Sequence, residues 1–378
     1  MQTRQGLQPG APMADNGDIY FSDDMAAKIA SSGTAWVRLN FSLGPTFKDW
    51  TETATYGFSA LSRYDTIVNS ALDHNLKVLG LLCNEAWPGS NQPADWRAGS
   101  AEAGRGTGHN PYIAEFVTFA ASKLMAHFAG RISHWQIWNE PNATTTYLYP
   151  SNFAWLLRRC YVAARDVGSP TLTVVSGGLL STHGMESNKL TSSNSGADYL
   201  RDTYRQGKAR SGWLDVKKVY GSYPIDVIGQ HLYIDQWSST TAERIEQATS
   251  LVRKAYVAEE GGKSDKPIHV TEVAWANNNV DEQTQAANLK IAYLKLKQLS
   301  YTPLTYWFFL QDIPLAGLYH GLLRSDGSEK PAWTTFCEVN DIHISPAPKA
   351  APRRLLDRFL QRGQRLWQTI LQHFPKLL

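Results

Sequence analysis

Two glutamates, Glu140 and Glu272, lie at the ends of short apolar stretches that are typical of buried strands. Glu140 follows residues 132–138, and Glu272 ends residues 268–272. If both strands belong to one parallel barrel, the two carboxyl groups project at the same end. Such a pair can hydrolyse a glycosidic bond, because one group protonates the leaving oxygen while the other attacks the carbon or activates water. Either glutamate alone could equally be a solvated residue of a loop.

The elements that must position these glutamates alternate along the chain. The sequence predicts strands over 34–39, 78–83, 132–138, 172–176, 227–231, 268–272 and 304–309. It predicts a helix over 25–31 before the first of these strands, and helices over 59–75, 111–129, 151–167, 196–206, 241–259 and 281–299 between them. For a first strand only the Pro/Gly-rich stretch 6–12 remains.

This alternation favours a closed (β/α)8 TIM barrel, an α/β fold, over residues 1–344. An open doubly wound sheet is the alternative, but no Gly-rich phosphate-binding motif follows the early strands. Long segments follow strands at 84–108, 177–195 and 311–325. They predict a functional face at the carboxyl ends of the strands.

Composition excludes several classes of protein. No apolar run reaches the ~18 residues of a membrane span, and the three widely spaced cysteines cannot form a disulfide framework or a zinc ribbon. Residues 353–378 hold six basic residues against one acidic residue, while the whole chain carries only +3. The barrel itself is therefore slightly acidic, and we expect no nucleic acid as a partner. We also expect no metal and no cofactor, since His269 has no second histidine at a useful spacing.

The segment Trp138-Asn139-Glu140-Pro141 resembles the signature of clan A glycoside hydrolases, and Thr271-Glu272 fits the seventh strand of that clan. The resemblance covers about residues 20–340 and is closest to family 39 and family 5-like members. It implies a retaining β-glycosidase with Glu140 as acid/base and Glu272 as nucleophile. Family 39 xylosidases usually carry an extra β-sandwich, for which this chain has no room, so the shorter endo-acting members are the better comparison.

The resemblance also gives the neighbours of the glutamates roles that agree with their chemistry. Arg38 is a permanent cation that could keep Glu272 ionised, and Tyr233 could donate to the same carboxylate. Asn139 could donate its amide to the sugar 2-hydroxyl. His231 could orient either partner, although a lone histidine on a strand is often structural. Glu140 needs a raised pKa, which we expect from partial burial and from the charge of Glu272.

Several tryptophans are candidates for contacts with a sugar. Trp307 on the last predicted strand is expected to form the floor of the sugar site, although it could instead pack at the top of the barrel. The loops after strands contain further tryptophans that could wall a cleft: Trp87, Trp96, Trp237 and Trp275. We include Trp87 and Trp275 among the substrate-binding residues.

The two ends of the chain predict features outside the barrel. Residues 345–352 are a Pro/Ala linker, and residues 353–378 form a basic amphipathic helix. This helix could contact an anionic membrane surface or a protein partner, or it could pack back on the barrel. No apolar signal segment begins the chain, which predicts a cytoplasmic location unless the N-terminus was trimmed.

Three functions use these residues: a retaining hydrolase, a non-catalytic carbohydrate-binding barrel, and a transglycosylase in which a sugar replaces water. The presence of both acids favours an enzyme over a binding module. All three take a carbohydrate as partner, and the sequence does not separate exo from endo action.

Overall fold

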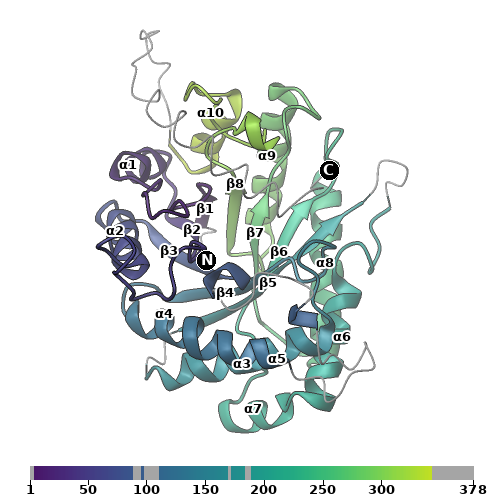
Figure 1. Cartoon of the computed structure of the whole chain (residues 1–378). Helices are drawn as coiled ribbons and strands as arrows, with labels where there is room; N and C mark the ends of the chain where they lie inside the picture. Colours follow the sequence, from purple (N-terminus) through teal and green to yellow (C-terminus); the bar gives the residue numbers. More distant parts are fainter. Residues whose placement is uncertain (1–3, 88–94, 98–109, 169–171, 184–188, 343–378) are drawn as a thin grey trace.

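A computed structural model describes residues 4–87, 95–97, 110–168, 172–183 and 189–342 of the chain (Figure 1). Its centre is a closed barrel of eight parallel strands that pair in chain order, with the last strand beside the first. The strands are β1 (Arg4–Gln8), β2 (Trp36–Asn40), β3 (Lys77–Leu82), β4 (His134–Asn139), β5 (Thr173–Thr182), β6 (Ile228–Tyr233), β7 (Ile268–Val273) and β8 (Leu304–Phe308). The predicted (β/α)8 barrel is therefore confirmed.

The helices surround this barrel (Figure 1). They are α1 (Asp23–Ser31), α2 (Ala60–Asp73), α3 (Pro111–Phe116), α4 (Ser122–His127), α5 (Pro150–Asp166), α6 (Ala197–Arg210), α7 (Trp213–Tyr220), α8 (Ala242–Glu259), α9 (Glu282–Gln298) and α10 (Pro331–Val339). A π-helical turn joins α3 to α4, so the predicted helix 111–129 is one nearly continuous element. The sequence analysis did not predict α7 or α10. Within the described residues, no helix combines the length and the apolar character needed to cross a membrane.

The ends of the helices follow local sequence signals. As predicted, Asn110 caps α3: its side chain accepts a hydrogen bond from the backbone N–H of Tyr112, and Pro111 occupies the first turn. Thr241 and Asp281 cap α8 and α9 in the same way. These caps fix where each helix begins relative to the preceding strand.

Most strands lie within about two residues of their predicted bounds, and two differ more. β1 lies at Arg4–Gln8, earlier than the predicted 6–12. Its weak pattern has a packing reason, since a Cβ at Gly6 would lie 2.2 Å from the ring of Tyr306. β5 extends to Thr182, so the first part of the predicted loop 177–195 is strand.

The hydrophobic core has two parts. The larger part lies between the strands and the helices and contains, for example, Val37 and Leu39 of β2. A small separate cluster fills the interior of the barrel, with Trp36, Leu79, Val175, Val227, Leu304 and Tyr306. Polar side chains occupy the barrel interior beyond this cluster, and they form the site described below.

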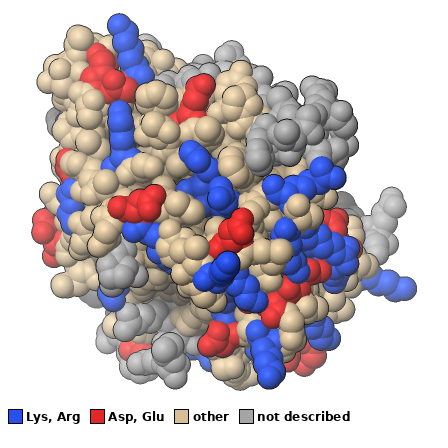
Figure 2. Space-filling view, turned by 90° about the horizontal axis from the view of Figure 1, so that it is seen from below, with Lys and Arg blue, Asp and Glu red and all other residues tan. Residues whose placement is uncertain are grey.

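The predicted linker 345–352 and the predicted basic helix 353–378 lie outside the described residues. On the face of the molecule seen from below, basic and acidic side chains are interspersed with uncharged surface (Figure 2). A nucleic-acid interface gathers basic residues on one face without acidic neighbours. This face does not have that character.

Candidate active site

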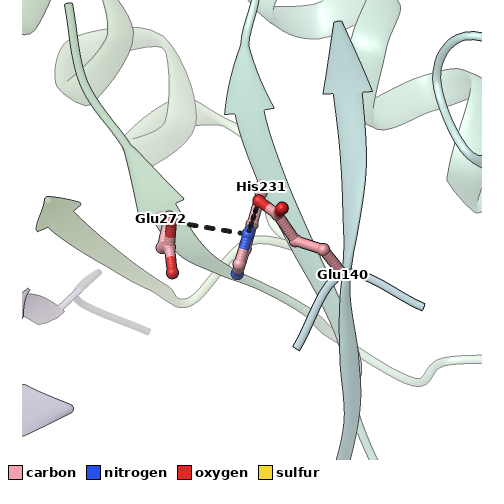
Figure 3. A group of neighbouring side chains, drawn as sticks. All are labelled: Glu140, His231 and Glu272. Carbon is pink, nitrogen blue, oxygen red and sulfur yellow. Dashed lines mark hydrogen bonds and ion pairs between the residues drawn. The ribbon is translucent and has the colours of Figure 1, made fainter. Parts of the chain in front are cut away.

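Three side chains from neighbouring parts of the barrel meet at the carboxyl ends of the strands (Figure 3). Glu140 directly follows β4, His231 lies on β6 and Glu272 lies on β7. The Nδ1 atom of His231 is 2.8 Å from Oε1 of Glu140 and 3.5 Å from Oε2 of Glu272. One ligand atom from each of the three residues lies within 4.8 Å of the other two. The structure thus brings the two predicted carboxyl groups together.

A bulge in β7 brings Glu272 into this group. Val270 pairs with Gln230 of β6, whereas the next pair along β6 joins His231 to Glu272, so Thr271 is an extra residue. The pairing with β8 shows the same irregularity after Val270. Bulges of this kind redirect side chains near active sites. Here the bulge places Glu272 opposite His231, on the inner side of the barrel.

Glu140 lies on a backbone of unusual geometry. Its φ angle is 44°, and that of Trp138 is 75°, a left-handed region that residues other than glycine rarely adopt. Hydrogen bonds hold the segment: the indole N–H of Trp138 donates to the carbonyl of Thr146, and the Thr146 hydroxyl donates to the carbonyl of Glu140. Each of these contacts is 2.8 Å long. Such strain concentrates at functional sites, where surrounding contacts over-determine the conformation.

The environment of Glu140 suits a proton donor. Its side chain is only 12% exposed, and burial raises the pKa of Glu140 to about 7, while the charge of Arg38 acts in the opposite direction. The sequence also predicts a contribution from the charge of Glu272. That cause was wrong, because Glu272 is paired with Arg38 and loss of water accounts for the rise.

Glu272 has two strong partners. Arg38 on β2 donates from Nη1 to Oε1 at 2.6 Å, and the hydroxyl of Tyr233 donates to Oε2 at 2.6 Å. Glu272 and Arg38 are both buried, so the ion pair is shielded from water. The two contacts predicted from the sequence hold the carboxylate in one orientation.

Arg38 connects four strands. Besides Glu272 on β7, its guanidinium donates to Oε1 of Gln136 at 2.9 Å and to Oδ1 of Asn139 at 2.8 Å, both on β4. It also donates to the side chain of Gln8 on β1. The sequence analysis missed Gln8 and Gln136, and no local pattern singles them out, because each is defined by a contact with a distant residue.

His231 is held neutral. Burial lowers the pKa of His231 to about 3, and within the described part of the chain Nε2 has no hydrogen-bond partner. A hydrogen on Nδ1 therefore faces acceptors, whereas a hydrogen on Nε2 faces none. The ring packs on Gly178 of β5, where a Cβ would lie 2.0 Å from Nε2. Two consecutive glycines inside a strand, Gly177 and Gly178, are the sequence signal that could have revealed this close approach.

Asn139 keeps a free donor near the carboxyl pair. Its carbonyl oxygen accepts from Arg38, while its amide nitrogen makes no hydrogen bond to another described residue. The side chain is half-buried. The amide N–H groups can therefore reach a bound molecule, as predicted for a contact with a sugar hydroxyl.

Three of the four predicted wall tryptophans, Trp87, Trp96 and Trp275, are buried, whereas Trp237 in the segment after β6 is 45% exposed. Trp275 and Trp307 are fully buried, and their indole N–H groups donate to the backbone carbonyls of Ile234 and His320. Trp87 is 5% exposed and packs at right angles to Trp96. Rings this deeply buried cannot stack on a sugar, so Trp87, Trp275 and Trp307 pack behind the site.

Another aromatic residue occupies the expected place of Trp307. Phe308, the next residue along β8, is only half-buried and packs edge-on against Tyr233 and His320. Alternation along the strand explains the difference, because successive side chains point to opposite faces. The strand and the aromatic type were predicted correctly, and the face was wrong.

Glu140, His231 and Glu272 form a group with spacing suited to a metal ion. Their chemistry does not fit one, because the guanidinium of Arg38 already neutralises Glu272 at 2.6 Å. A divalent cation there would face a buried positive charge. The cluster is better suited to moving a proton between a neutral and an ionised carboxyl group.

Solved structures with the same barrel support the fold. The chain is similar to a family 39 glycoside hydrolase from Bacteroides cellulosilyticus WH2, with 19% identity, a TM-score of 0.53, and coverage of 89% of this chain and 63% of that chain. This chain therefore spans less than two thirds of that protein.

Two further structures give the same picture. A GH10 xylanase from termite gut has 16% identity and a TM-score of 0.55, with 90% of this chain and 76% of that chain covered. An exo-β-1,4-mannosidase from Opitutaceae bacterium strain TAV5 has 15% identity and a TM-score of 0.57, with 90% and 59% covered. No family model and no curated protein matches the sequence. At these identities the likeness establishes the barrel fold.

Proposed function

We propose that this protein is a retaining β-glycoside hydrolase that cleaves a poly- or oligosaccharide by double displacement. Glu140 is the acid/base and Glu272 is the nucleophile. The observation that carries the proposal is the pairing of a buried carboxyl group of raised pKa with an ion-paired carboxylate. When two carboxyl groups have environments that differ in this way, the buried one suits the acid role and the ion-paired one suits the nucleophile role.

In the first step, Glu140 transfers its proton to the glycosidic oxygen while an oxygen of Glu272 attacks the anomeric carbon. The bond to the leaving sugar breaks, and a glycosyl ester forms on Glu272. The Nδ1–H of His231 donates to Oε1 of Glu140, which leaves Oε2 to carry the transferable proton. Asn139 can donate to the sugar hydroxyl next to the reacting carbon.

In the second step, the ionised Glu140 takes a proton from water, and the hydroxide attacks the anomeric carbon from the face that the leaving sugar vacated. The ester bond breaks, Glu272 regains its charge, and Arg38 and Tyr233 stabilise that charge. The configuration at the anomeric carbon is retained.

The separation of the carboxyl groups supports this mechanism over inversion. One oxygen of Glu140 lies within 4.8 Å of one oxygen of Glu272. Retaining enzymes place their carboxyl groups about 5–5.5 Å apart, and inverting enzymes about 6.5–9.5 Å apart to admit a water molecule.

The choice of substrates for testing follows from the fold relatives. One is named a xylanase and another an exo-β-1,4-mannosidase, so β-1,4-xylan and β-1,4-mannan are the first polysaccharides to try. We propose attack within the polysaccharide chain.

The test is to digest xylan, mannan and their oligosaccharides and to follow the first anomer released by NMR. A β product formed before mutarotation supports double displacement, whereas an α product excludes Glu272 as the nucleophile. If the protein binds these glycans and never cleaves them, it is a carbohydrate-binding barrel. If it extends added acceptor sugars faster than it releases free sugar, it is a transglycosylase.

A further inference from the structure

Three aromatic side chains form a corner next to the proposed nucleophile. The hydroxyl of Tyr233 donates to Glu272. The ring of Tyr233 meets the rings of Phe308 and His320 nearly at right angles, in each case with centroids 6.1 Å apart. Phe308 and His320 also meet edge-on, at 5.5 Å. All three side chains are only half-buried, so this aromatic corner keeps an open surface beside Glu272.

The backbone at His320 is fixed by contacts with two strand ends. The indole N–H of Trp307 on β8 donates to the carbonyl of His320 at 2.9 Å. The carbonyl of the preceding residue, Tyr319, accepts a hydrogen bond of 2.9 Å from the backbone N–H of Asn277, which follows β7. Neither contact uses the imidazole, so the ring is held in place while its nitrogens stay free.

The two ring nitrogens of His320 have different surroundings. Nδ1 is buried and has no hydrogen bond to a described residue, whereas Nε2 has no described partner either but is open to solvent. Burial lowers the pKa of His320 to about 4, and the charge of Lys330 acts in the same direction, so the ring is neutral at pH 7. A hydrogen on Nδ1 would remain an unsatisfied donor, so the neutral ring carries its hydrogen on Nε2, where an acceptor can reach it.

The aromatic corner lies across the barrel from Asn139. Phe308 ends β8 and Asn139 ends β4, and in a closed barrel of eight strands these two are four strands apart in either direction. In a pyranose ring, C2 lies on one side of the anomeric carbon, and the ring oxygen with C5 lies on the other. If Asn139 binds the 2-hydroxyl, as in the proposed function, the C5 side of the sugar faces the aromatic corner.

The substituent on C5 distinguishes three classes of sugar. A hexose carries a hydroxymethyl group there, a pentose carries hydrogen, and a uronic acid carries a carboxylate. The ring of Phe308 beside one N–H donor matches a hydroxymethyl group, which is an apolar carbon that bears an oxygen. A carboxylate is less suited, because Arg38 and Lys330 already have carboxylate partners at 2.6 and 2.7 Å.

We propose that His320 is a specificity-determining residue, whose Nε2–H donates to the hydroxymethyl oxygen of the reacting sugar. The enzyme then cleaves neutral hexosides in preference to pentosides and uronosides. This inference rests on the proposed function and deepens it by naming the class of the reacting sugar. Of the two polysaccharides chosen above, it favours mannan over xylan.

Aryl glycosides that differ only at C5 test this preference. The 4-nitrophenyl β-glycosides of mannose, 6-deoxymannose and lyxose carry a hydroxymethyl group, a methyl group and hydrogen at C5, and those of glucose, 6-deoxyglucose and xylose repeat the series with the other configuration at C2. In the series that the wild type cleaves faster, kcat/KM for the hexoside should exceed that for the 6-deoxy sugar about 3- to 10-fold. The pentoside should be poorer still, and the glucuronide should be cleaved more slowly than the glucoside.

Variants of His320 separate the hydrogen bond from packing. His320→Phe keeps a flat ring and removes the N–H, so kcat/KM for the hexoside should fall about 3- to 10-fold, while the 6-deoxy sugar and the pentoside change less than about 2-fold. His320→Gln can place an amide N–H near the position of Nε2 and should keep more of the hexoside preference than His320→Phe. The control is His74→Phe at a half-buried histidine that ends α2, which should affect no substrate.

Two outcomes on these substrates overturn the proposal: an equal loss for all members of a series in His320→Phe, which a purely structural role predicts, or a wild-type preference for the pentoside. If the wild type cleaves none of the glycosides, the proposed hydrolase fails, and calorimetry then tests His320 by itself. The tighter-binding of cellobiose and mannobiose should bind at least ~3-fold more tightly than xylobiose, and His320→Phe should remove the difference. Equal binding of these disaccharides, or no binding of any, also overturns the proposal.

Discussion

His231 and Glu272 stand directly opposite each other on β6 and β7, and they do so because Thr271 is an extra residue in β7. In a regular strand, side chains alternate between the two faces, so Glu272 would share a face with Val270 rather than with His269. Val270 belongs to the outer core of the barrel. The bulge therefore determines that the proposed nucleophile faces the interior and not a helix.

The first prediction concerns the proposed acid. Glu140→Gln should lower kcat on xylan or mannan by about 10²–10⁴, since the amide cannot give a proton to the leaving oxygen. An aryl glycoside with a highly acidic phenol as leaving group needs little protonation, so its first step should lose much less. Initial rates on both substrates check this. The control is Glu85→Gln, a glutamate near the end of β3 that has no part in the proposed mechanism. An equal loss on both substrates would contradict the acid role.

The second prediction concerns pH. The proposed acid must be protonated, and the pKa of Glu140 is raised to about 7. We expect kcat/KM to fall about tenfold per pH unit above pH about 7. The residual rate of Glu140→Gln on the aryl glycoside should lack this limb. If the activity of the variant still falls above pH about 7, a group other than Glu140 is responsible for the fall.

The third prediction concerns stability. The pKa of Glu140 is about 7 in the folded protein against 4.5 for the unperturbed group. Its contribution is fully present below pH 4.5 and is lost as pH rises through 7. Because Glu140→Gln cannot lose a proton, it should gain up to about 3 kcal/mol of unfolding free energy relative to wild type between pH 4.5 and pH 8.

Urea unfolding at both pH values measures this gain. The exposed Glu115→Gln should show almost no change between them. If the two variants respond equally to pH, the burial of Glu140 does not control its titration.

The fourth prediction concerns Arg38. Arg38→Met leaves Glu272 buried without a cation and should cost about 3–5 kcal/mol of unfolding free energy. Arg38→Lys keeps the charge, but one ammonium cannot reach all the acceptors, so kcat should fall at least ~100-fold. Lys28→Met breaks the partly exposed ion pair with Glu329 and should cost about 0–1 kcal/mol. Similar losses for the two methionine variants would argue against a buried ion pair at the site.

The fifth prediction separates packing from catalysis. Gly178→Ala puts a methyl group 2.0 Å from Nε2 of His231, and Gly207→Ala puts one 2.3 Å from the ring of Trp213, on the helices outside the barrel. Both should lower stability by about 1–3 kcal/mol. Only Gly178→Ala should lower kcat and shift the alkaline limb of the pH profile. Matching kinetics in the two variants would mean that His231 does not position Glu140.

Much of the fold could be predicted because its signals are local. Apolar runs gave seven strands, and caps such as Asn110 and Pro111 gave helix starts. α7 was missed because it has only eight residues, too few for its period to stand out between Gly212 and Gly221. β1 was predicted at the wrong residues because Gly6 is needed for close packing against the ring of Tyr306. A glycine in a strand weakens its sequence pattern, and the distant residue that requires it cannot be read from the strand alone.

The residues of the site also fall into two groups: those that the sequence itself marks could be predicted, and those defined by contacts with distant residues could not. Glu140, Asn139 and Glu272 could be found from the strand ends and the Trp-Asn-Glu-Pro segment, whereas Arg38, His231 and Tyr233 were predicted from the resemblance to clan A glycoside hydrolases. The roles of Gln8, Gln136 and Gly178 depend on which distant residue each one touches. The face shown by Trp307 and Phe308 depends on the register of β8, and a register is a property of paired strands.

The position of Arg38 has a consequence for how the chain acquires activity during synthesis. Its partners lie on β1, β4 and β7, so the anionic partner leaves the ribosome more than two hundred residues after the arginine. A nascent chain that ends before β7 contains Arg38 and its amide partners but lacks Glu272, the proposed nucleophile. On the proposed mechanism, a product truncated before β7 is therefore expected to be inert rather than weakly active.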